Sequence, residues 1–286
     1  MNGSISSKTT ICGIIGDPIE HTMSPAMHNA AFREMGLDYI YLPLRVTRED
    51  LGSAIEGLKA LNIRGLNVTI PHKVEVMQYL GRLDPLAEKI GAVNTIVNDE
   101  GIMTGYNTDA TGFLQPLLER EIEPEGKNIV ILGAGGASRA VSYILADRGA
   151  KLKIMNRQLE LAWAEELAAR ISHVFNMRVE AMELTRANLI YALEDADILV
   201  NATSVGMSPN NDETPVEADL LRPGLIVCDI VYNPIQTKLI REAEAAGAKT
   251  ISGINMLVWQ GVLAFEKWTG LKPPFQLMKE EAIKLL

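Results

Sequence analysis

The stretch Asn128-Ile-Val-Ile-Leu-Gly-Ala-Gly-Gly-Ala-Ser138 decides the fold of its part of the chain, because a buried strand runs directly into a glycine-rich turn. The apolar run 140–146 follows and predicts a helix. This order is typical of a dinucleotide site, where glycines let the backbone approach a pyrophosphate and the helix N-terminus supplies amide donors. The alternative is a glycine-rich helix start needed only for close packing. We favour a pyrophosphate cradle made by Gly133, Ala134, Gly135, Gly136 and Ala137.

The end of the next predicted strand bears on the choice of dinucleotide. NAD sites usually place an acidic residue there, about 20 residues after the first glycine, to bind the ribose hydroxyls. Here the strand ends in Asn156 and Arg157, with no acid at 156–158. A guanidinium can pair with a 2′-phosphate and stack on adenine, although an arginine at a strand end is often only a solvated cation. The sequence therefore favours NADP.

Strands and helices alternate over the whole chain, which predicts an α/β protein with mostly parallel sheets. We expect an N-terminal α/β substrate domain over 1–110 and a Rossmann-like dinucleotide domain over 111–252. The remaining residues 253–286 predict two helices that pack back on the first domain and complete it. In the second domain, strands are expected near 128–132, 151–155, 178–182, 197–201, 225–230 and 249–251.

Lys73 is the main candidate for acid–base chemistry. Pro71 predicts the start of a helix with Lys73 in its first turn. A cation is disfavoured beside the positive end of a helix dipole, so this lysine is expected to have a carboxylate partner, and Asp109 is the best candidate. Such a pair could exchange a proton with a substrate hydroxyl. For a lone lysine the alternative is a solvated side chain or a surface salt bridge.

Further polar residues at strand ends and turns suit a hydroxylated substrate. Ser24 as the N-cap and Pro25 at the first helical position predict a helix start, and the hydroxyls there could bind a carboxylate. Gln260 lies four residues after Met256 on one helical face and could reach a substrate hydroxyl, or could be an ordinary exposed glutamine. The short side chains that accompany Lys73 are Asn67, Thr69, Asn94 and Thr95. Together with the glycine-rich turn, they indicate hydride transfer between a dinucleotide and a hydroxylated small molecule.

None of the four histidines is favoured as the proton donor. His173 lies outside all motifs and is expected at the surface. His72 precedes Lys73 but adjacent helix positions face different ways. His21 and His28 are expected to make loop or cap hydrogen bonds.

Composition excludes several classes of partner. The 286 residues are 47% hydrophobic and 22% charged, with a net charge of −9, which argues against nucleic acid and anionic membranes. Both cysteines, Cys12 and Cys228, lie in apolar runs and are expected to be buried free thiols. The spacing of histidine and cysteine predicts no metal site. The polar N-terminal segment 1–10 and the absence of a long apolar run predict a cytoplasmic protein.

The combined motifs resemble the shikimate dehydrogenases over about residues 11–270. They occur in the order typical of that family: GDPIEHTMSPAMHN, NVTIPHK, GAVNT, NTD, GAGGASRA, NATSVGM, DIVYNP and GINMLVWQG. The resemblance implies two α/β domains and an NADP-dependent, reversible reduction of 3-dehydroshikimate to shikimate, on the pathway to aromatic amino acids.

The resemblance also implies roles for individual residues. Lys73 and Asp109 would be the catalytic pair, and Thr22 and Ser24 would hold the substrate carboxylate. Asn67, Thr69, Asn94, Asp109 and Gln260 would bind the substrate hydroxyls, and Tyr232 would approach the substrate. The nicotinamide side would be lined by Thr203, Ser204, Ile230, Gly253 and Met256.

Two positions depart from the family pattern. The family usually has serine at the position of Thr22, so an extra methyl group narrows the carboxylate pocket here. The adenine-side motif usually reads Asn-Arg-Thr with a further basic residue, whereas this chain reads Asn156-Arg157-Gln158-Leu-Glu160. A quinate or shikimate dehydrogenase that uses NAD, and a dinucleotide-binding sensor without turnover, therefore remain as alternatives. The oligomeric state is open, with a homodimer as one candidate.

Overall fold

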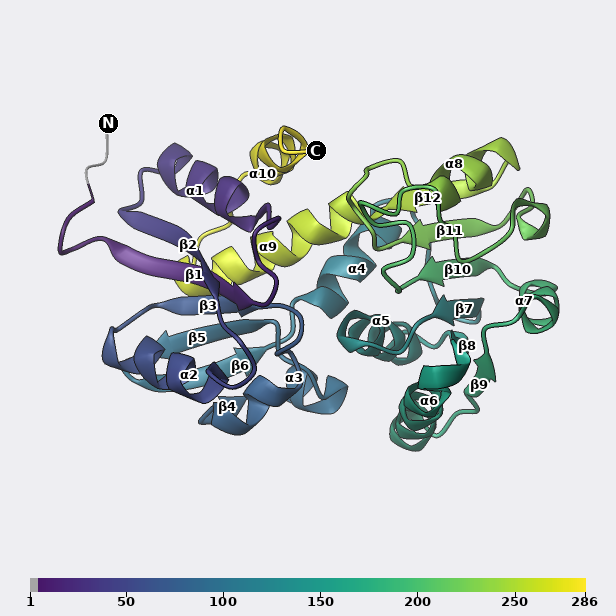
Figure 1. Ribbon diagram of the computed structural model, residues 1–286, viewed down its shortest axis with the longest axis horizontal. Coiled ribbons are helices and arrows are strands. Elements are labelled where there is room, and N and C mark those ends of the chain that lie inside the picture. Colours follow the sequence, from purple (N-terminus) through teal and green to yellow (C-terminus); the bar gives the residue numbers. More distant parts are fainter. Residues whose placement is uncertain (1–4) are drawn as a thin grey trace. The chain divides into compact units, whose positions relative to one another are not determined.

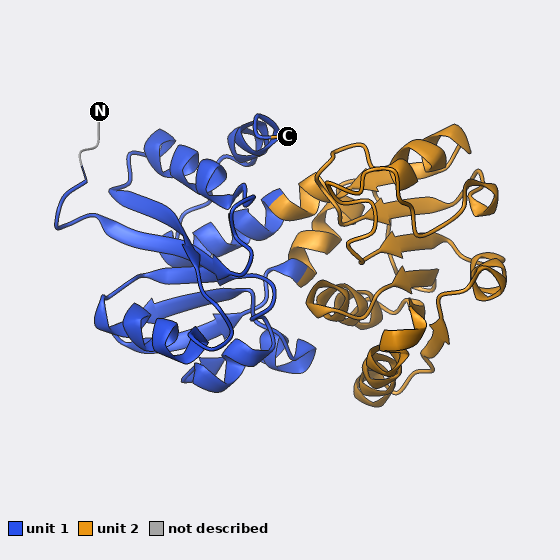
Figure 2. Cartoon of the chain, viewed as in Figure 1, with its two compact units in different colours: residues 1–109, 258–285 blue, residues 110–257, 286 orange. Residues whose placement is uncertain are grey.

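A computed structural model describes residues 5–286, so the first four residues of the polar N-terminal segment lie outside the described residues. The chain forms two compact units (Figure 2). Unit 1 comprises residues 1–109 and 258–285, and unit 2 comprises residues 110–257 and 286. The chain thus leaves unit 1 after Asp109 and returns to it at Val258. Each unit contains one six-stranded sheet (Figure 1).

The sheet of unit 1 is mixed and has the strand order β2-β1-β3-β5-β6-β4. Strand β1 pairs in parallel with β2 and β3, and β4 pairs in parallel with β6. Strand β5 pairs antiparallel with β3 and with β6, and β5 and β6 form a hairpin. The strands are β1 (Thr10–Gly16), β2 (Tyr39–Arg45), β3 (Gly65–Val68), β4 (Arg82–Leu83), β5 (Thr95–Asp99) and β6 (Ile102–Tyr106).

Helices cover both faces of this sheet. On one face, Leu51, Ile55 and Leu58 of α2 (Leu51–Ala60) belong to a buried cluster with Leu66 of β3. This cluster also contains apolar side chains from the 3₁₀ helix η1 (Glu75–Tyr79) and from α3 (Pro85–Ile90). Helix α3 begins after Asp84, whose side chain caps it, and ends at Gly91, where φ is +74°.

The opposite face is built around aromatic rings. His28 and Phe32 lie on α1 (Ser24–Glu34), Tyr41 lies on β2, and Phe265 and Trp268 come from α9 (Gly253–Thr269). Their ring centroids are 4.4 to 6.3 Å apart. The Trp268 indole also donates to the carbonyl of Ile96 over 3.0 Å. The last helix, α10 (Phe275–Ile283), packs against α1. The prediction that the C-terminal helices return to the first sheet is therefore confirmed.

The sheet of unit 2 is entirely parallel, with the strand order β12-β11-β10-β7-β8-β9. Counted from its first strand, this is the order 6-5-4-1-2-3 of a Rossmann-like sheet, which confirms the predicted fold class. In such sheets ligands bind outside the carboxyl ends of the strands. The strands are β7 (Asn128–Leu132), β8 (Lys151–Asn156), β9 (Glu180–Glu183), β10 (Ile198–Asn201), β11 (Ile226–Asp229) and β12 (Lys249–Ser252).

Helices also lie against the strands of unit 2. Helices α5 (Gly136–Asp147) and α6 (Leu161–Phe175) contact β7, β8 and β9. Helices α7 (Arg186–Leu193) and α8 (Lys238–Ala245) contribute to a second buried cluster with Val130, Leu199 and Val227 of the strands. The unit is completed by α4 (Asp109–Leu118) and by two 3₁₀ helices, η2 (Gln158–Glu160) and η3 (Ala218–Leu220).

Two local predictions are wrong. No helix begins at Pro71: residues 71–74 form turns, and Lys73 precedes η1. The Lys73 carbonyl instead accepts a hydrogen bond from the amide of Val93 (2.7 Å), and this bond to a loop far along the sequence holds residue 73 outside a helical turn. Ser24 is the first residue of α1 rather than its cap, and the cap residue, Met23, provides no side-chain hydrogen bond.

Candidate active site

An ion pair between Lys73 and Asp109 lies at the centre of the polar residues of unit 1. The Lys73 Nζ atom is 2.6 Å from Oδ2 of Asp109, and the side chains are only 16% and 7% exposed. The bond between the Lys73 carbonyl and Val93 fixes the backbone of the lysine. Asp109 is the first residue of α4, where the helix dipole favours a negative charge. The predicted partnership is thus present, although Lys73 lies in a turn.

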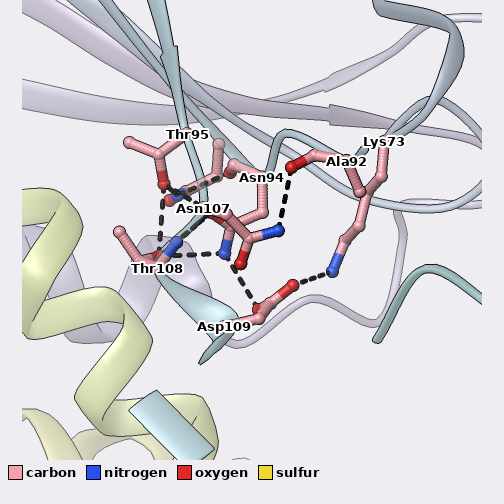
Figure 3. Close-up of polar contacts among 8 residues, drawn as sticks. Lys73, Ala92, Asn94, Thr95, Asn107, Thr108 and Asp109 are labelled. Atoms are coloured by element: carbon pink, nitrogen blue, oxygen red, sulfur yellow. Dashed lines mark hydrogen bonds and ion pairs between the residues drawn. The ribbon is translucent and has the colours of Figure 1, made fainter. Parts of the chain in front are cut away.

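Asn94 supports this pair (Figure 3). Its Nδ2 donates to Oδ1 of Asp109 and to Oγ1 of Thr108, each over 2.9 Å. Its Oδ1 accepts from the Thr108 amide (2.7 Å) and from the Thr95 hydroxyl (3.0 Å). Nearby, Asn107 donates to the carbonyl of Ala92. Both oxygens of Asp109 therefore face a fixed donor, one a cation and the other an amide.

Asn67 on β3 is held in one orientation. Its Nδ2 donates to the Asn94 carbonyl (3.2 Å) and to Thr95 Oγ1 (3.1 Å), which uses both amide hydrogens. Its Oδ1 accepts from the hydroxyl of Tyr41 (2.6 Å). The only hydrogen-bonding position still open on the Asn67 side chain is the second lone pair of Oδ1, which can accept a hydrogen bond. Sequence reasoning missed Tyr41 because its ring reaches Asn67 across the intervening strand β1.

The two hydroxyl residues proposed for a carboxylate lie at the start of α1. Thr22 is half-buried, and its Oγ1 accepts from the backbone amide of Ser24 over 3.4 Å. Ser24 is buried, and its side chain hydrogen-bonds to the phenol of Tyr41. Burial raises the pKa of Tyr41 well above its usual value, so this phenol stays protonated. Tyr41 thus connects the Thr22–Ser24 turn to Asn67.

Two further predicted residues lie elsewhere in unit 1. Thr69 is half-buried and follows β3, and its methyl group lies where a side chain on Gly16 would be. Gln260 lies on α9 and is buried, which excludes the alternative of an ordinary exposed glutamine.

The glycine-rich turn of unit 2 has the backbone that a dinucleotide pyrophosphate requires. Gly133 follows β7 with φ of +99°, and a Cβ atom there would lie 2.9 Å from the Ala202 carbonyl oxygen. A Cβ on Gly135 would meet no atom within 4 Å, so the turn presents bare backbone next to open space. Helix α5 then begins at Gly136 without a side-chain cap. These residues fit a pyrophosphate on chemical grounds.

The remaining predicted cofactor residues follow the carboxyl ends of the neighbouring strands of unit 2. Asn156 ends β8, and its Oδ1 accepts from the amide of Arg157 (3.0 Å). The other residues are Thr203 and Ser204 after β10, Ile230 after β11, and Gly253 and Met256 after β12. Tyr232, which is predicted to approach the substrate, also follows β11. Ile230, Gly253 and Met256 line one small pocket together with Cys228 and Asp229. The strand order therefore brings the whole set to one edge of the sheet.

Asp229, at the end of β11, is a buried residue that sequence reasoning missed. Its Oδ1 accepts from Asn201 Nδ2 (2.9 Å) and from the Val231 amide (3.0 Å), and its Oδ2 accepts from the Thr237 hydroxyl (2.6 Å). Asn201 in turn accepts from the Thr203 hydroxyl (2.6 Å). Burial raises the pKa of Asp229 to about 6, although its three hydrogen bonds oppose the shift. The motif DIVYNP contains this aspartate, so the sequence did offer a signal by which Asp229 could have been identified.

The histidines have no place in the proton chemistry that the site offers. His28 is fully buried among aromatic rings, and burial lowers its pKa to about 3. Neither of its ring nitrogens has a hydrogen-bond partner, so the expected cap hydrogen bond is wrong. His72 is buried and donates from Nε2 to the carbonyl of Val46 (2.7 Å). His173 is exposed, as predicted.

Cys12 and Cys228 are free and buried, which confirms the expectation for both. Among residues 5–286, no group of three or more histidine, cysteine or acidic side chains is placed to hold a metal ion. No helix in the described part of the chain is long and apolar enough to cross a membrane.

Known protein families match most of the chain. Residues 14–96 match the shikimate dehydrogenase substrate binding domain, residues 117–230 match shikimate / quinate 5-dehydrogenase, and residues 253–283 match the shikimate 5′-dehydrogenase C-terminal domain. A shikimate dehydrogenase (NADP(+)) of Methanopyrus kandleri is 49% identical over 286 residues, which cover 99% of this chain and 98% of the relative.

Solved structures agree with this assignment. A shikimate dehydrogenase in complex with NADP+ is 45% identical, with a TM-score of 0.93 over 99% of this chain and 97% of the other. The shikimate 5-dehydrogenase of Listeria monocytogenes in complex with shikimate and NAD is 40% identical, with a TM-score of 0.91 over 98% of each chain. These identities extend over both units, so the likeness is not restricted to a common nucleotide-binding fold. The chain belongs to the shikimate dehydrogenase family.

Proposed function

We propose that the protein catalyses the reversible, NADP-dependent reduction of 3-dehydroshikimate to shikimate. The observation that carries this proposal is the buried pair of Lys73 and Asp109, which provides a positioned cationic proton donor in unit 1. Unit 1 would bind the substrate, and the Rossmann-like unit 2 would bind the dinucleotide. Relatives that carry the name shikimate dehydrogenase (NADP(+)), and solved relatives with NADP+ or with shikimate bound, support the same activity.

Lys73 would donate the proton that the substrate oxygen takes up during reduction, and would accept it again in the oxidation. Bound NADPH supplies the hydride. Asp109 would keep the ammonium group oriented, since its Oδ2 accepts directly from Nζ. Asn94 would act on the reaction through Asp109, because both hydrogens of its side-chain amide are already donated, to Thr108 and to Asp109. A direct hydrogen bond from Asn94 to the substrate would have to replace one of these two bonds.

The substrate would be held by its carboxylate and its hydroxyls. Thr22 and Ser24 would bind the carboxylate at the start of α1. Asn67 would accept from a substrate hydroxyl, because both of its amide hydrogens are already used. The other contacts would come from Thr69, Gln260 and Tyr232. Burial raises the pKa of the Tyr232 phenol, so it would act as a neutral hydrogen-bonding group.

In unit 2, the backbone from Gly133 to Ala137 would hold the pyrophosphate, and Arg157 with Asn156 would bind the adenosine end. The nicotinamide side would be lined by Thr203, Ser204, Ile230, Gly253 and Met256. Arg157 is expected to read the 2′-phosphate of NADP, since NAD lacks this group.

An activity assay tests the proposal. Purified protein should oxidise NADPH, followed by absorbance, when 3-dehydroshikimate is added, and should reduce NADP in the presence of shikimate. Parallel assays with quinate and with NAD would identify the alternative, a quinate or shikimate dehydrogenase that uses NAD. Binding of NADPH without turnover of either acid would indicate a sensor and would refute the proposed reaction.

Two properties accompany this function. The buried free thiols are compatible with a reducing compartment, and we infer that the protein works in the cytoplasm. A homodimer is the assembly to be tested, and size-exclusion chromatography with light scattering distinguishes it from a monomer.

A further inference from the structure

Arg157 is paired with a carboxylate from its own loop. Its Nε donates to Oε2 of Glu160 over 2.8 Å, and its Nη2 donates to Oε1 over 2.6 Å, so the contact is bidentate. The loop between them is also closed by a side-chain contact, because Asn156 Nδ2 donates to the backbone carbonyl of Glu160 over 3.0 Å. The first contact holds the Glu160 carboxylate against the guanidinium, and the second holds the Glu160 backbone close to Asn156.

The carboxylate of Glu160 offsets much of the positive charge of the Arg157 guanidinium. The Arg157 side chain is 70% exposed, whereas that of Glu160 is 23% exposed. The hydrogen bond from Arg157 holds the pKa of Glu160 below its usual value, so the carboxylate is ionised at neutral pH. No other cation lies among residues 156–161. In its best amide orientation, Gln158 donates to a second carboxylate, that of Glu183.

We propose that Glu160 weakens the preference of this protein for NADPH over NADH by opposing the binding of the 2′-phosphate at Arg157. The inference rests on the proposed function, in which Arg157 reads that phosphate. A dianionic phosphate that approaches the guanidinium also approaches the carboxylate and is repelled by it. NADH has a neutral hydroxyl at this position, and the same carboxylate can accept a hydrogen bond from it. Glu160 therefore narrows the difference in affinity between NADPH and NADH.

The alternative is that Glu160 holds Arg157 in the orientation that binds the 2′-phosphate, which would increase the affinity for NADPH. Two features argue for opposition. The bidentate contact occupies Nε and one hydrogen of Nη2, so the pair can persist while a phosphate approaches the outer edge of the guanidinium. The Arg157 side chain is also largely exposed, and an ion pair at an exposed site contributes little to holding a side chain in one orientation. The negative charge, in contrast, acts on the phosphate whether or not the pair opens.

The substitution Glu160→Gln separates charge from position, because glutamine keeps an acceptor for Arg157 and removes the carboxylate charge. We expect the Kd and the KM for NADPH to fall roughly three- to tenfold, as for one unit charge removed several ångströms from a dianion in water. The kcat and the KM for NADH should change little. Calorimetry with 2′,5′-ADP and with 5′-AMP gives a readout without turnover, and only 2′,5′-ADP should bind more tightly.

The matched control is Glu180→Gln. Glu180 lies on β9, the strand that pairs with β8, and three residues before Glu183, which pairs with Asn156. It forms a similar exposed ion pair with Arg178 (3.2 Å). This variant loses the same charge but should leave both cofactor affinities unchanged. The double variant Arg157→Gln with Glu160→Gln should bind NADPH more tightly than Arg157→Gln alone, because the carboxylate repels the 2′-phosphate whether or not the guanidinium is present.

The outcomes separate the inference from the function on which it rests. If Glu160→Gln weakens NADPH or changes both cofactors equally, Glu160 positions the loop and the inference is wrong. If it changes neither cofactor while Arg157→Gln selectively weakens NADPH, the inference fails and the proposed role of Arg157 stands. If Arg157→Gln weakens both cofactors equally, the 2′-phosphate is not read at Arg157 and that part of the proposed function fails.

Discussion

Asn94 donates to one carboxylate oxygen of Asp109 and leaves the other to Lys73. The aspartate is thereby placed by a neutral group that is itself fixed by Thr95 and Thr108. A change at any of these positions can act on the lysine without touching the substrate.

Lys73→Gln should lower kcat by about 10² to 10⁴, the usual contribution of a positioned proton donor. Glutamine can still donate a hydrogen bond to Asp109, so the fold and the KM for shikimate should change little. Steady-state kinetics and thermal unfolding measure both effects. The exposed Lys59→Gln is the control and should be fully active. Near-normal turnover of the Lys73 variant would remove the lysine from the mechanism.

Asp109→Asn should impair turnover more than stability. If its oxygen keeps the bond from Asn94, its new amide nitrogen faces the Lys73 ammonium, and a donor then opposes a donor. The lysine loses its acceptor and its orientation. The comparison is kcat against the unfolding temperature of the same preparation. A variant that fails to fold would instead assign Asp109 a structural role.

Thr22→Val should weaken the binding of shikimate by about 1.5 to 3 kcal/mol, because it keeps the shape and removes a hydrogen bond to a charged group. Thr22→Ser keeps the hydroxyl and should bind shikimate at least as well as the parent protein. A shikimate analogue without the carboxylate should bind poorly to the parent and be insensitive to the valine. Normal binding of shikimate by the valine variant would show that the carboxylate lies elsewhere.

Asp229→Asn should change how stability depends on pH. The folded pKa of about 6 lies above the usual 3.8, so the contribution of protonated Asp229 is complete below pH 3.8 and is lost as the pH rises through 6. Asparagine does not titrate. The free energy of unfolding of the variant, relative to the parent, should therefore rise by about 2 to 3 kcal/mol between pH 4 and pH 7.

Urea unfolding of both proteins at several pH values measures this difference, and groups common to both cancel. The exposed Asp212→Asn is the control and should give a flat difference. A flat difference for Asp229→Asn as well would mean that its pKa is not raised by folding.

Much of this architecture could be predicted from local patterns. The Gly133–Gly136 turn could be predicted because a strand, a glycine-rich segment and a helix start follow one another directly in the sequence. The order of strands in unit 2 then brings Arg157 and Gly253 to the same edge, as parallel sheets require. Asn94 and Asp109 could be named because they follow or precede strands in short motifs.

Contacts between distant strands could not be predicted in this way. The bond from Val93 to the Lys73 carbonyl depends on how two loops align, and it overrides the helix that Pro71 indicates. The reach of Tyr41 to Asn67 depends on β1 lying between their strands. The pairing of Arg157 with Glu160 depends on side-chain rotamers, which leave no periodic signal in the sequence.

The bond from Trp268 to Ile96 joins residues that are 172 positions apart. During synthesis at about 5 to 20 residues per second, the ribosome needs roughly 10 to 30 seconds to add the intervening chain. Strand β5 and the aromatic face of its sheet are therefore made long before the indole that covers them, whereas unit 2 emerges as one continuous segment. The order of synthesis exposes the apolar surface of the unit 1 sheet until the last helices arrive, and the nascent protein must avoid aggregation during that interval.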